Sequence, residues 1–291
     1  MLRLAKDVAS EIGKNVAMKV PAIRRWRVSR PRTGERFSGK PGQLRLRAFQ
    51  ALDALRAADV DVSGLRVIEI GPGDFLTSGM AIVAAGADHY ASMDRFAGDY
   101  SRLEGKEWYA GIEQGWSEYY PDLEWPEWLH AESFPEGYVP ERVNALNAAV
   151  EEIADLGEPF DVLCSFQVAE HVSDLKAFVD THRRLLKPGG VAVHRVDFGA
   201  HGVWYGYPDP LTFLRFSDPL WKAMGSARGT PNRYRIHELV EAFEKGRFAA
   251  ELRDVNTVTR GEVRLARLGR RFREMPIESL LTDSATLVVR V

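Results

Sequence analysis

Apolar residues recur every three to four positions along the first twenty residues of the chain. Polar and basic residues separate these apolar positions, which are Leu2, Leu4, Val8, Ile12, Val16 and Val20. This spacing gathers the apolar side chains on one face of an α-helix. The pattern therefore predicts an amphipathic helix over 2–20, followed by a loop over 31–42 and a second helix over 44–58.

Beyond residue 65, short apolar runs alternate with helical patterns. We expect strands at 66–70, 89–94, 160–166 and 191–196, and helices at 77–85 and 174–186. The stretch 141–153 fits either a helix or a further strand. Strands separated by helices form right-handed βαβ units, so the pattern predicts an α/β fold with a doubly wound, mostly parallel sheet.

The end of the chain departs from this alternation. A helix near 236–244 is followed by two strand patterns, near 251–258 and 285–291. Because no helical pattern separates these two strands, we expect them to form a hairpin-like antiparallel edge of the sheet.

One long segment, 98–140, interrupts the alternation after the second predicted strand. Its four tryptophans are Trp108, Trp116, Trp125 and Trp128. The segment begins at a strand end, where open α/β sheets bind ligands, and long insertions at such places often form lids or substrate walls. We expect it to wall the acceptor site; local packing of a large loop is the alternative, and the two do not exclude each other.

The charge of the chain is balanced overall and uneven locally. Its 291 residues carry a formal net charge of −2, which gives no bias toward nucleic acid. Residues 1–50, however, hold 13 Lys and Arg against three acidic residues. We therefore divide the chain into a basic helical extension over 1–43 and a main domain over 44–291. The extension is expected to pack on the domain, and contact with an anionic membrane surface or a charged glycan is the alternative.

Composition also bears on where the protein works. No stretch reaches the ~18 apolar residues of a membrane span, and the first residues do not resemble a signal peptide. The single cysteine, Cys164, lies in an apolar run and has no partner for an intrachain disulfide. We expect a reduced thiol in a cytoplasmic protein, with peripheral membrane contact through the basic extension as an alternative.

The first predicted strand breaks into a glycine-rich turn at Gly71 and Gly73, and Asp94 ends the next strand. Such a turn lets a nucleotide-like ligand approach the backbone, and the carboxylate can accept both ribose hydroxyl protons. A dinucleotide fingerprint needs a third glycine where this chain has Leu76, and a phosphate-binding loop needs a lysine that is missing. S-adenosylmethionine (SAM), which carries a ribose but no phosphate, fits these residues better than NAD.

Four motifs then resemble, in order and spacing, those of class I SAM-dependent methyltransferases. They are VIEIGPGD at 67–74, YASMD at 90–94, FDVLCSFQVAEHV at 160–172 and LLKPGG at 185–190. The resemblance covers about residues 44–291. It implies a Rossmann-like, doubly wound, seven-stranded sheet that is mostly parallel with an antiparallel edge strand, preceded here by the N-terminal helical extension.

The resemblance also implies which residues hold SAM. The amino acid end of SAM would contact Glu69, Gly71 and Gly73, and its ribose would bind Asp94. The adenine would lie against Ala149 and Val150, and Gln167 would cover the methionine part. A narrower resemblance, carried by GPGD, by a DRFAGDY stretch, by VDFGAH and by NRYR, is to methyltransferases of bacterial polysaccharide and glycolipid biosynthesis.

Candidate residues for the methyl acceptor follow the later strands. We predict His201 as general base with Asp197 orienting it, because a carboxylate raises the basicity of an imidazole and fixes its tautomer. The alternative is a divalent metal held by the same two residues, although the chain suggests no third ligand. His194 is expected to pack within its strand, and His171 to shape the cofactor or acceptor site.

Three further residues precede the last predicted helix: Asn232, Arg233 and Arg235. The arginines could pair with a carboxylate or phosphate of the acceptor, and a solvated helix start is the alternative. The expected reaction is O-methylation of a sugar hydroxyl in a glycan or glycolipid precursor. Rival expectations are methylation of an aromatic or polyketide-type product, and a SAM-binding regulator without catalysis. The sequence does not indicate the oligomeric state.

Overall fold

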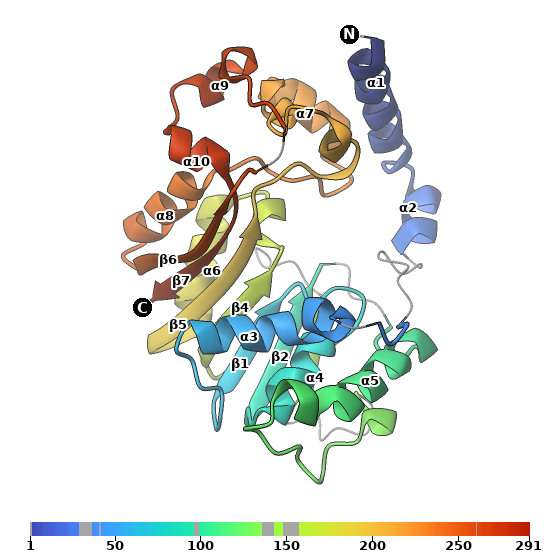
Figure 1. Ribbon diagram of the computed structural model, residues 1–291, viewed down its shortest axis with the longest axis vertical. Helices are drawn as coiled ribbons and strands as arrows, with labels where there is room; N and C mark the ends of the chain where they lie inside the picture. Colours follow the sequence, from blue (N-terminus) through green and yellow to red (C-terminus); the bar gives the residue numbers. More distant parts are fainter. Residues whose placement is uncertain are drawn as a thin grey trace.

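The computed structural model describes residues 2–28, 37–40, 42–95, 99–135, 143–147, 157–259 and 261–291. Within these residues, a seven-stranded sheet runs in the order β3-β2-β1-β4-β5-β7-β6 (Figure 1). The strands are β1 (Arg66–Ile70), β2 (His89–Asp94), β3 (Val143–Asn147), β4 (Phe160–Phe166), β5 (Leu186–Asp197), β6 (Ala249–Thr257) and β7 (Thr282–Arg290). The first five strands pair in parallel, and β7 runs antiparallel to both of its neighbours.

The helices are distributed along the whole chain. The longer ones are α1 (Leu2–Ala17), α2 (Pro21–Val28), α3 (Gln50–Ala57), α4 (Thr77–Ala84), α5 (Leu103–Tyr119), α6 (Leu175–Leu185), α7 (Asp218–Gly225) and α8 (Ile236–Lys245). Shorter pieces are η1 (Arg45–Phe49), η2 (Ala131–Ser133), η3 (Ala169–His171), η4 (Gly202–Gly206), η5 (Thr212–Arg215), η6 (Leu265–Arg267), α9 (Arg270–Arg273) and α10 (Ile277–Leu281).

Both faces of the sheet are covered, as in a doubly wound fold (Figure 1). Successive strand residues point to opposite faces, so Val67 and Ile68 belong to different cores. Val67 belongs to the core that includes residues of α3, α4 and α5, among them Met80, whereas Ile68 belongs to the core that includes residues of α6 and α8, among them Phe178. The predicted α/β, mostly parallel sheet is therefore confirmed.

Some details of the sheet differ from the prediction. The ambiguous stretch 141–153 contains a strand, β3. The antiparallel strand is β7, one place in from the edge, and β6 lies outside it. The segment between them contains α9 and α10, so β6 and β7 do not form a tight hairpin. β5 also begins at Leu186 rather than Val191, with a register shift against β4 in between.

The described part of the aromatic segment, 99–135, is a helix with a packed tail rather than an open loop. Trp116 is buried and donates its indole N–H to the carbonyl of Leu123 at 2.9 Å. Its ring packs on Tyr120 and Trp125, with centroids 4.8 and 5.4 Å away. These aromatic side chains build the core beneath α5, because their large apolar rings are shielded there from water. Trp108 is the tryptophan of this segment that also lines the cavity described below.

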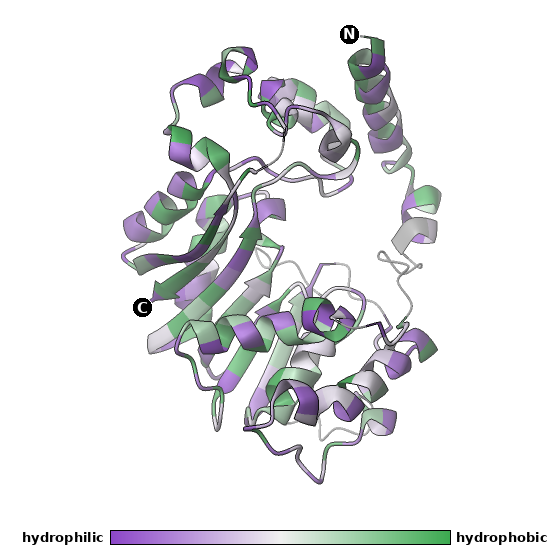
Figure 2. Ribbon diagram, viewed as in Figure 1, coloured by the Kyte–Doolittle hydropathy of each residue, from purple (hydrophilic) through white to green (hydrophobic). Residues whose placement is uncertain are grey.

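The N-terminal helix α1 docks on α7. Asn15 is fully buried and donates to the carbonyl of Ala223 at 2.9 Å, while its own oxygen accepts from the backbone N–H of Ala227 at 2.8 Å. Apolar side chains of α1, among them Val8 and Ile12, pack on the core around α7. Figure 2 shows the mixture of hydrophilic and hydrophobic residues along α1 that permits this one-sided packing.

A buried polar chain crosses the core between β4, β5 and α6. His182 donates from Nδ1 to the carbonyl of Phe178 at 2.7 Å, because that oxygen can only accept. Its Nε2 then accepts from His194 Nε2 at 2.8 Å, and His194 Nδ1 accepts from the Ser165 hydroxyl at 2.7 Å. Burial lowers the pKa of both imidazoles, that of His182 to about 4. His194 thus packs within its strand, as predicted.

Candidate active site

The carboxyl ends of β1, β2 and β4 open into a cavity of about 1420 Å³. Three groups of residues at the strand ends line it: 69–75, 93–95 and 166–168. Other parts of its lining come from the α1–α2 junction, from η1, and from the loop 225–232 after α7. Binding at the carboxyl edge is expected for an open α/β sheet, because loops from several strands meet there.

The glycine turn after β1 supplies bare backbone to this cavity. Gly71 and Gly73 have φ values of +73° and +84°, which side chains other than glycine rarely adopt. A Cβ on Gly71 would lie 2.5 Å from a methyl of Val168, so this position is closed by packing. Among the described residues, a Cβ on Gly73 would meet nothing within 4 Å and would project into open space. A ligand can therefore approach the chain at Gly73.

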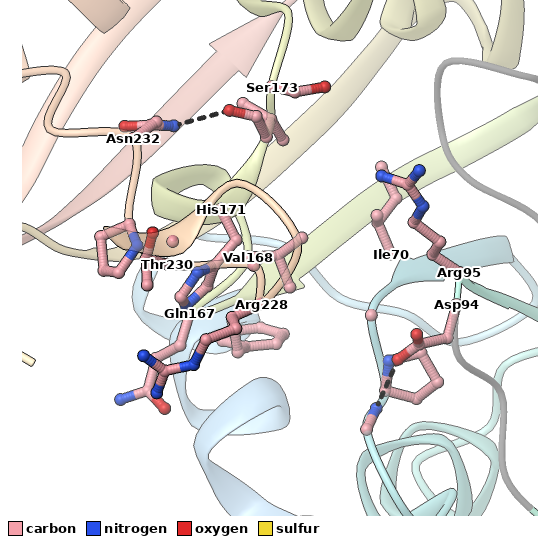
Figure 3. Close-up of a pocket in the computed structure, with 18 of the residues that line it drawn as sticks. Ile70, Asp94, Arg95, Gln167, Val168, His171, Ser173, Arg228, Thr230 and Asn232 are labelled. Atoms are coloured by element: carbon pink, nitrogen blue, oxygen red, sulfur yellow. Dashed lines mark hydrogen bonds between the residues drawn. The ribbon is translucent and has the colours of Figure 1, made fainter. Parts of the chain in front are cut away.

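Asp94 is fixed beside this turn. One carboxylate oxygen accepts from the backbone N–H of Gly73 at 3.3 Å, and the side chain lines the cavity (Figure 3). This hydrogen bond joins the ends of β1 and β2 and holds the carboxylate in the wall of the cavity. The arrangement fits a ribose, whose two hydroxyls need an acceptor.

Glu69 lies deeper in the floor of the cavity. The Tyr90 hydroxyl donates to its carboxylate, and the side chain is 2% exposed. Burial raises the pKa of Glu69 to about 7, and the negative charge of Asp94 adds to this effect. A cationic ammonium group in the cavity would stabilise the ionised form. The residues at the strand ends thus fit the amino acid end of SAM as well as its ribose.

Gln167 follows β4 with a left-handed backbone, φ +59°. Its backbone N–H donates to the carbonyl of Arg195 at 2.8 Å, and its side chain lines the cavity. A non-glycine residue held in this conformation is strained, and such strain is frequent at ligand sites. Figure 3 shows Gln167 and His171 on one side of the cavity and Asp94 on the other.

The histidines are arranged differently from the prediction. His171 lines the cavity, whereas His201 and Asp197 are not part of its lining. His201 Nε2 lies 3.2 Å from Asp197 Oδ2, and the His201 ring meets the His171 ring edge-on, with centroids 5.6 Å apart. The predicted pair therefore exists, but it stands behind His171 instead of facing a ligand.

Asp197 is held ionised in this group. Burial opposes its charge, but hydrogen bonding and charge from His201, the Gly199 N–H and the charge of His171 lower the pKa of the carboxyl. The ionised carboxylate lies beside the His201 ring, which packs on the ring of His171. The three side chains thus form one cluster behind the cavity wall.

The arginines predicted to bind the acceptor do not reach the cavity. Arg235 is 1% exposed and donates to the carbonyls of Phe198, Ser279, Leu280 and Thr282. Arg233 is 2% exposed and is held by two carbonyls and by Asp218. Both guanidinium groups have a structural role, since they donate hydrogen bonds to backbone carbonyls in the interior of the fold. The prediction that they meet the acceptor is wrong.

Asn232 lines the cavity, but its amide is also engaged. It donates to the carbonyls of Ala169 and Val172 at 2.8 and 3.0 Å and accepts from the Tyr234 N–H at 2.8 Å. Asn232 therefore ties the loop before α8 to the turn that carries His171, which positions that histidine.

Two predicted contacts, Ala149 and Val150, lie outside the described residues. Within the described part of the chain, no group of three or more His, Cys, Asp or Glu side chains is arranged to hold a metal ion. In the same residues, no helix is long and apolar enough to cross a bilayer.

Comparison with known proteins decides the family. The model of the family described as "Methyltransferase domain" matches residues 42–249. The chain belongs to this family. It is a SAM-dependent methyltransferase of class I, and SAM is its cofactor.

Individual relatives of this methyltransferase are more distant or match only briefly. A ubiquinone biosynthesis O-methyltransferase of Cereibacter sphaeroides is 47% identical over 47 residues, which are 16% of this chain and 19% of that protein. The chain therefore spans about a fifth of the length of this curated relative. One from Rhizobium leguminosarum bv. trifolii is 44% identical over 41 residues, 14% of this chain and 16% of that protein.

Solved structures match this chain at low sequence identity. A SAM-dependent methyltransferase from Mesorhizobium loti is 17% identical, with a TM-score of 0.48, and the match covers 85% of this chain and 100% of that one. Phosphoethanolamine N-methyltransferase 2 of Haemonchus contortus, solved with SAM, is also 17% identical, with a TM-score of 0.44, covering 83% of this chain and 52% of that one.

Sequence reasoning missed the cationic residues of the methyltransferase cavity. Four of them, Lys19, Arg24, Lys222 and Arg228, come from α1, α2, α7 and the segments next to them, and Arg47, Arg95 and Arg271 line the cavity as well. The basic bias of residues 1–50 marked the first two as unusual, but it did not place them at the active site. No motif marked Arg228, whose loop is notable only for its small residues and glycines.

Proposed function

We propose that this methyltransferase methylates a hydroxyl oxygen of a sugar in a glycan or glycolipid precursor. The observation that carries the proposal is the mixed cavity wall: one side fits SAM, and the other presents His171 with polar and cationic side chains. Sugar hydroxyls need polar partners for orientation, and an alcohol must lose a proton during transfer.

The residues have separate roles in this reaction. Bound SAM supplies an electrophilic methyl group on its sulfonium. His171 takes the proton that the acceptor hydroxyl releases while the oxygen–carbon bond forms and the sulfur–carbon bond breaks. Asp197 and His201 act through His171, because the negative charge of Asp197 stabilises its protonated ring and the ring of His201 packs against it. Asp94 and the glycine turn hold the methyl donor.

An aromatic or polyketide-type acceptor is the second candidate. The short matches to ubiquinone biosynthesis O-methyltransferases and the aromatic rings of Phe75, Trp108 and Trp221 in the cavity wall favour it. Against it, Trp116 and Tyr120 pack inside the core beneath α5, so Trp108 is the one tryptophan of the predicted aromatic segment that lines the cavity. The cationic lining also suits a polar acceptor better.

An acceptor panel distinguishes the candidates. Transfer of a labelled methyl group from SAM should be measured to sugars, sugar phosphates and nucleotide sugars, and in parallel to phenols and polyketides. The proposal expects transfer to a carbohydrate that is lost in His171→Ala. Transfer to phenols alone would contradict it, and SAM binding without transfer to any acceptor class would favour the regulator.

We further propose a cytoplasmic protein whose N-terminal helices touch an anionic membrane surface. Val16, Val20, Ile23 and Trp26 are 40–57% exposed and follow one another at helical spacing beside Arg25. Apolar side chains flanked by cations suit the membrane interface.

Sedimentation with phosphatidylglycerol vesicles tests this contact. The Ile23→Ser/Trp26→Ser double variant should lose binding, whereas Leu265→Ser, which removes an exposed leucine elsewhere, should keep it. Absence of vesicle binding by the unmodified protein would refute the contact.

A further inference from the structure

Four cations enter the active-site cavity from the side formed by α1, α2 and α7. Lys19 and Arg24 come from the α1–α2 junction, Lys222 from α7, and Arg228 from the loop that follows α7. Lys19 and Arg24 are about two hundred positions from Lys222 and Arg228 in the sequence, and both pairs line the same cavity because Asn15 fixes α1 to α7. The basic N-terminal extension is therefore a wall of the active site.

Arg228 is held in place by a buried acid of α1. Its guanidinium pairs with Glu11, which also accepts from Lys14 at 2.7 Å. Burial opposes the charge of Glu11, but hydrogen bonds and charges from Lys14 and Arg228 lower its pKa. One carboxylate thus serves two cations, so the group keeps an excess of positive charge. Figure 3 shows Arg228 on the same side of the cavity as Gln167 and His171.

The other three cations lack carboxylate partners in the described residues. No ion pair within 4.0 Å joins Lys19, Arg24 or Lys222 to an acid in that part of the chain. The acids of the cavity lining are Glu69, Asp74, Asp94 and Asp218. The first three belong to the ends of β1 and β2, and Asp218, at the start of α7, is already paired with Arg233 and Arg271. The protein itself does not neutralise this side of the cavity.

We propose that Lys19, Arg24, Lys222 and Arg228 form a subsite for a phosphate or diphosphate group of the methyl acceptor. A single carboxylate on the acceptor would be satisfied by one arginine. A diphosphate carries several negative charges and many acceptor oxygens, so it can pair with all four cations. The like-charged side chains repel one another when the cavity holds no anion, so a polyanion that bridges them gains from all four. The proposal rests on the proposed function, since it concerns the acceptor of the same reaction.

The subsite gives the N-terminal extension a role in acceptor choice. An acceptor whose phosphate lies against α1 and α7 can present its hydroxyl to His171, which lines the same cavity. A neutral acceptor would lack this anchor. The class of reaction that supplies the acceptor is then phosphoryl or nucleotidyl transfer onto a sugar or alcohol.

Calorimetric titration of inorganic pyrophosphate into the full-length protein saturated with S-adenosylhomocysteine tests the subsite. We expect binding that weakens at least tenfold in Lys19→Ala/Arg24→Ala, two exposed positions whose change does not threaten folding. Arg228→Ala should weaken it as well. Lys245→Ala and Arg264→Ala, which remove exposed cations outside the cavity, are the matched controls and should bind like the unmodified protein.

The outcomes separate the two proposals. Equal pyrophosphate affinity in the controls and the cavity variants would overturn the subsite. Absence of pyrophosphate binding in a protein that binds S-adenosylhomocysteine would also overturn the subsite. This holds even if the cavity substitutions abolish binding to phosphatidylglycerol vesicles, because the cations would then serve the membrane and not the acceptor. Failure to bind S-adenosylhomocysteine at all would instead overturn the proposed function.

Discussion

The ring of His201 meets the ring of His171 edge-on, with 5.6 Å between their centroids, and only His171 lines the cavity. This relationship assigns the two histidines different tasks. His171 can contact an acceptor, and His201, 3.2 Å from Asp197, can act on the reaction only through its neighbour.

His171→Ala should therefore lower kcat by about 10²–10⁴, the range for loss of a general base. His201→Ala should cause a smaller loss and shift the pH profile of kcat, because it changes the surroundings of His171 without removing it. S-adenosylhomocysteine affinity should stay unchanged in both variants. A larger loss of kcat in His201→Ala than in His171→Ala would contradict this order.

The glycine turn should respond differently at its two positions. Gly71→Ala adds a Cβ 2.5 Å from Val168 at a positive φ, and should lower the free energy of unfolding by about 2 kcal/mol or more. Gly73→Ala carries only the backbone strain, about 1–2 kcal/mol. It should nevertheless weaken cofactor binding, since its methyl group projects into the cavity. Urea unfolding and calorimetry on both variants check this; equal stabilities would count against the packing at Gly71.

The buried pair His182 and His194 should make stability pH-dependent. The folded pKa of His182, about 4, lies below the ordinary 6.5 because burial disfavours the charged ring. The contribution of neutral His182 to the free energy of unfolding is fully present above pH 6.5. It is lost as the pH falls toward 4, since the unfolded chain then binds the proton more readily. The difference between the folded and the unfolded pKa corresponds to about 3 kcal/mol of this free energy.

Urea midpoints at pH 7.5, 6.0 and 4.5 measure this effect. The His182→Gln variant can keep both hydrogen bonds but does not titrate. In this variant, the part of the fall in urea midpoint with falling pH that is due to His182 should vanish. Comparing the variant with the unmodified protein at each pH removes the effect of other titrating groups. Parallel pH curves for the two proteins would show that His182 does not carry the dependence.

Docking of α1 should depend on Asn15. Asn15→Ala leaves the Ala227 N–H and the Ala223 carbonyl without their partner, which should lower the free energy of unfolding by about 1–3 kcal/mol. Asn256→Ala removes an exposed asparagine and serves as control. Thermal unfolding of both variants checks the prediction, and an Asn15 variant as stable as the control would argue against the observed docking.

The sequence predicted the buried strands well. The bounds of β2 and β4 match the prediction, because a buried parallel strand is a short apolar run that a turn ends sharply. Helix α5 was missed, since it contains Gly105, Gly111 and Gly115, which disfavour a helix locally. Tertiary packing explains all three glycines. A Cβ on Gly111 would lie 2.4 Å from the ring of Phe37, one on Gly115 2.9 Å from a methyl of Leu44, and one on Gly105 3.0 Å from the ring of Phe75.

The cofactor side of the site was predictable and the acceptor side was not. Gly71, Gly73 and Asp94 lie within one βαβ unit, so local motifs bring them together. Arg235 looked like an anion-binding residue, but distant carbonyls surround it. The cations of α1 reach the cavity only through contacts between segments about two hundred residues apart, which no local pattern encodes.

Binding of S-adenosylhomocysteine to Asp94→Ala tests the central claim most directly. Asp94 faces the cavity from the end of β2, so its loss should weaken binding by about 2–3 kcal/mol, the worth of charge-assisted hydrogen bonds to a ribose. Asp88→Ala, an exposed change just before the same strand, is the matched control and should bind normally. Calorimetry should also show no binding of NAD. Unchanged affinity in Asp94→Ala, or binding of NAD in place of S-adenosylhomocysteine, would contradict the account.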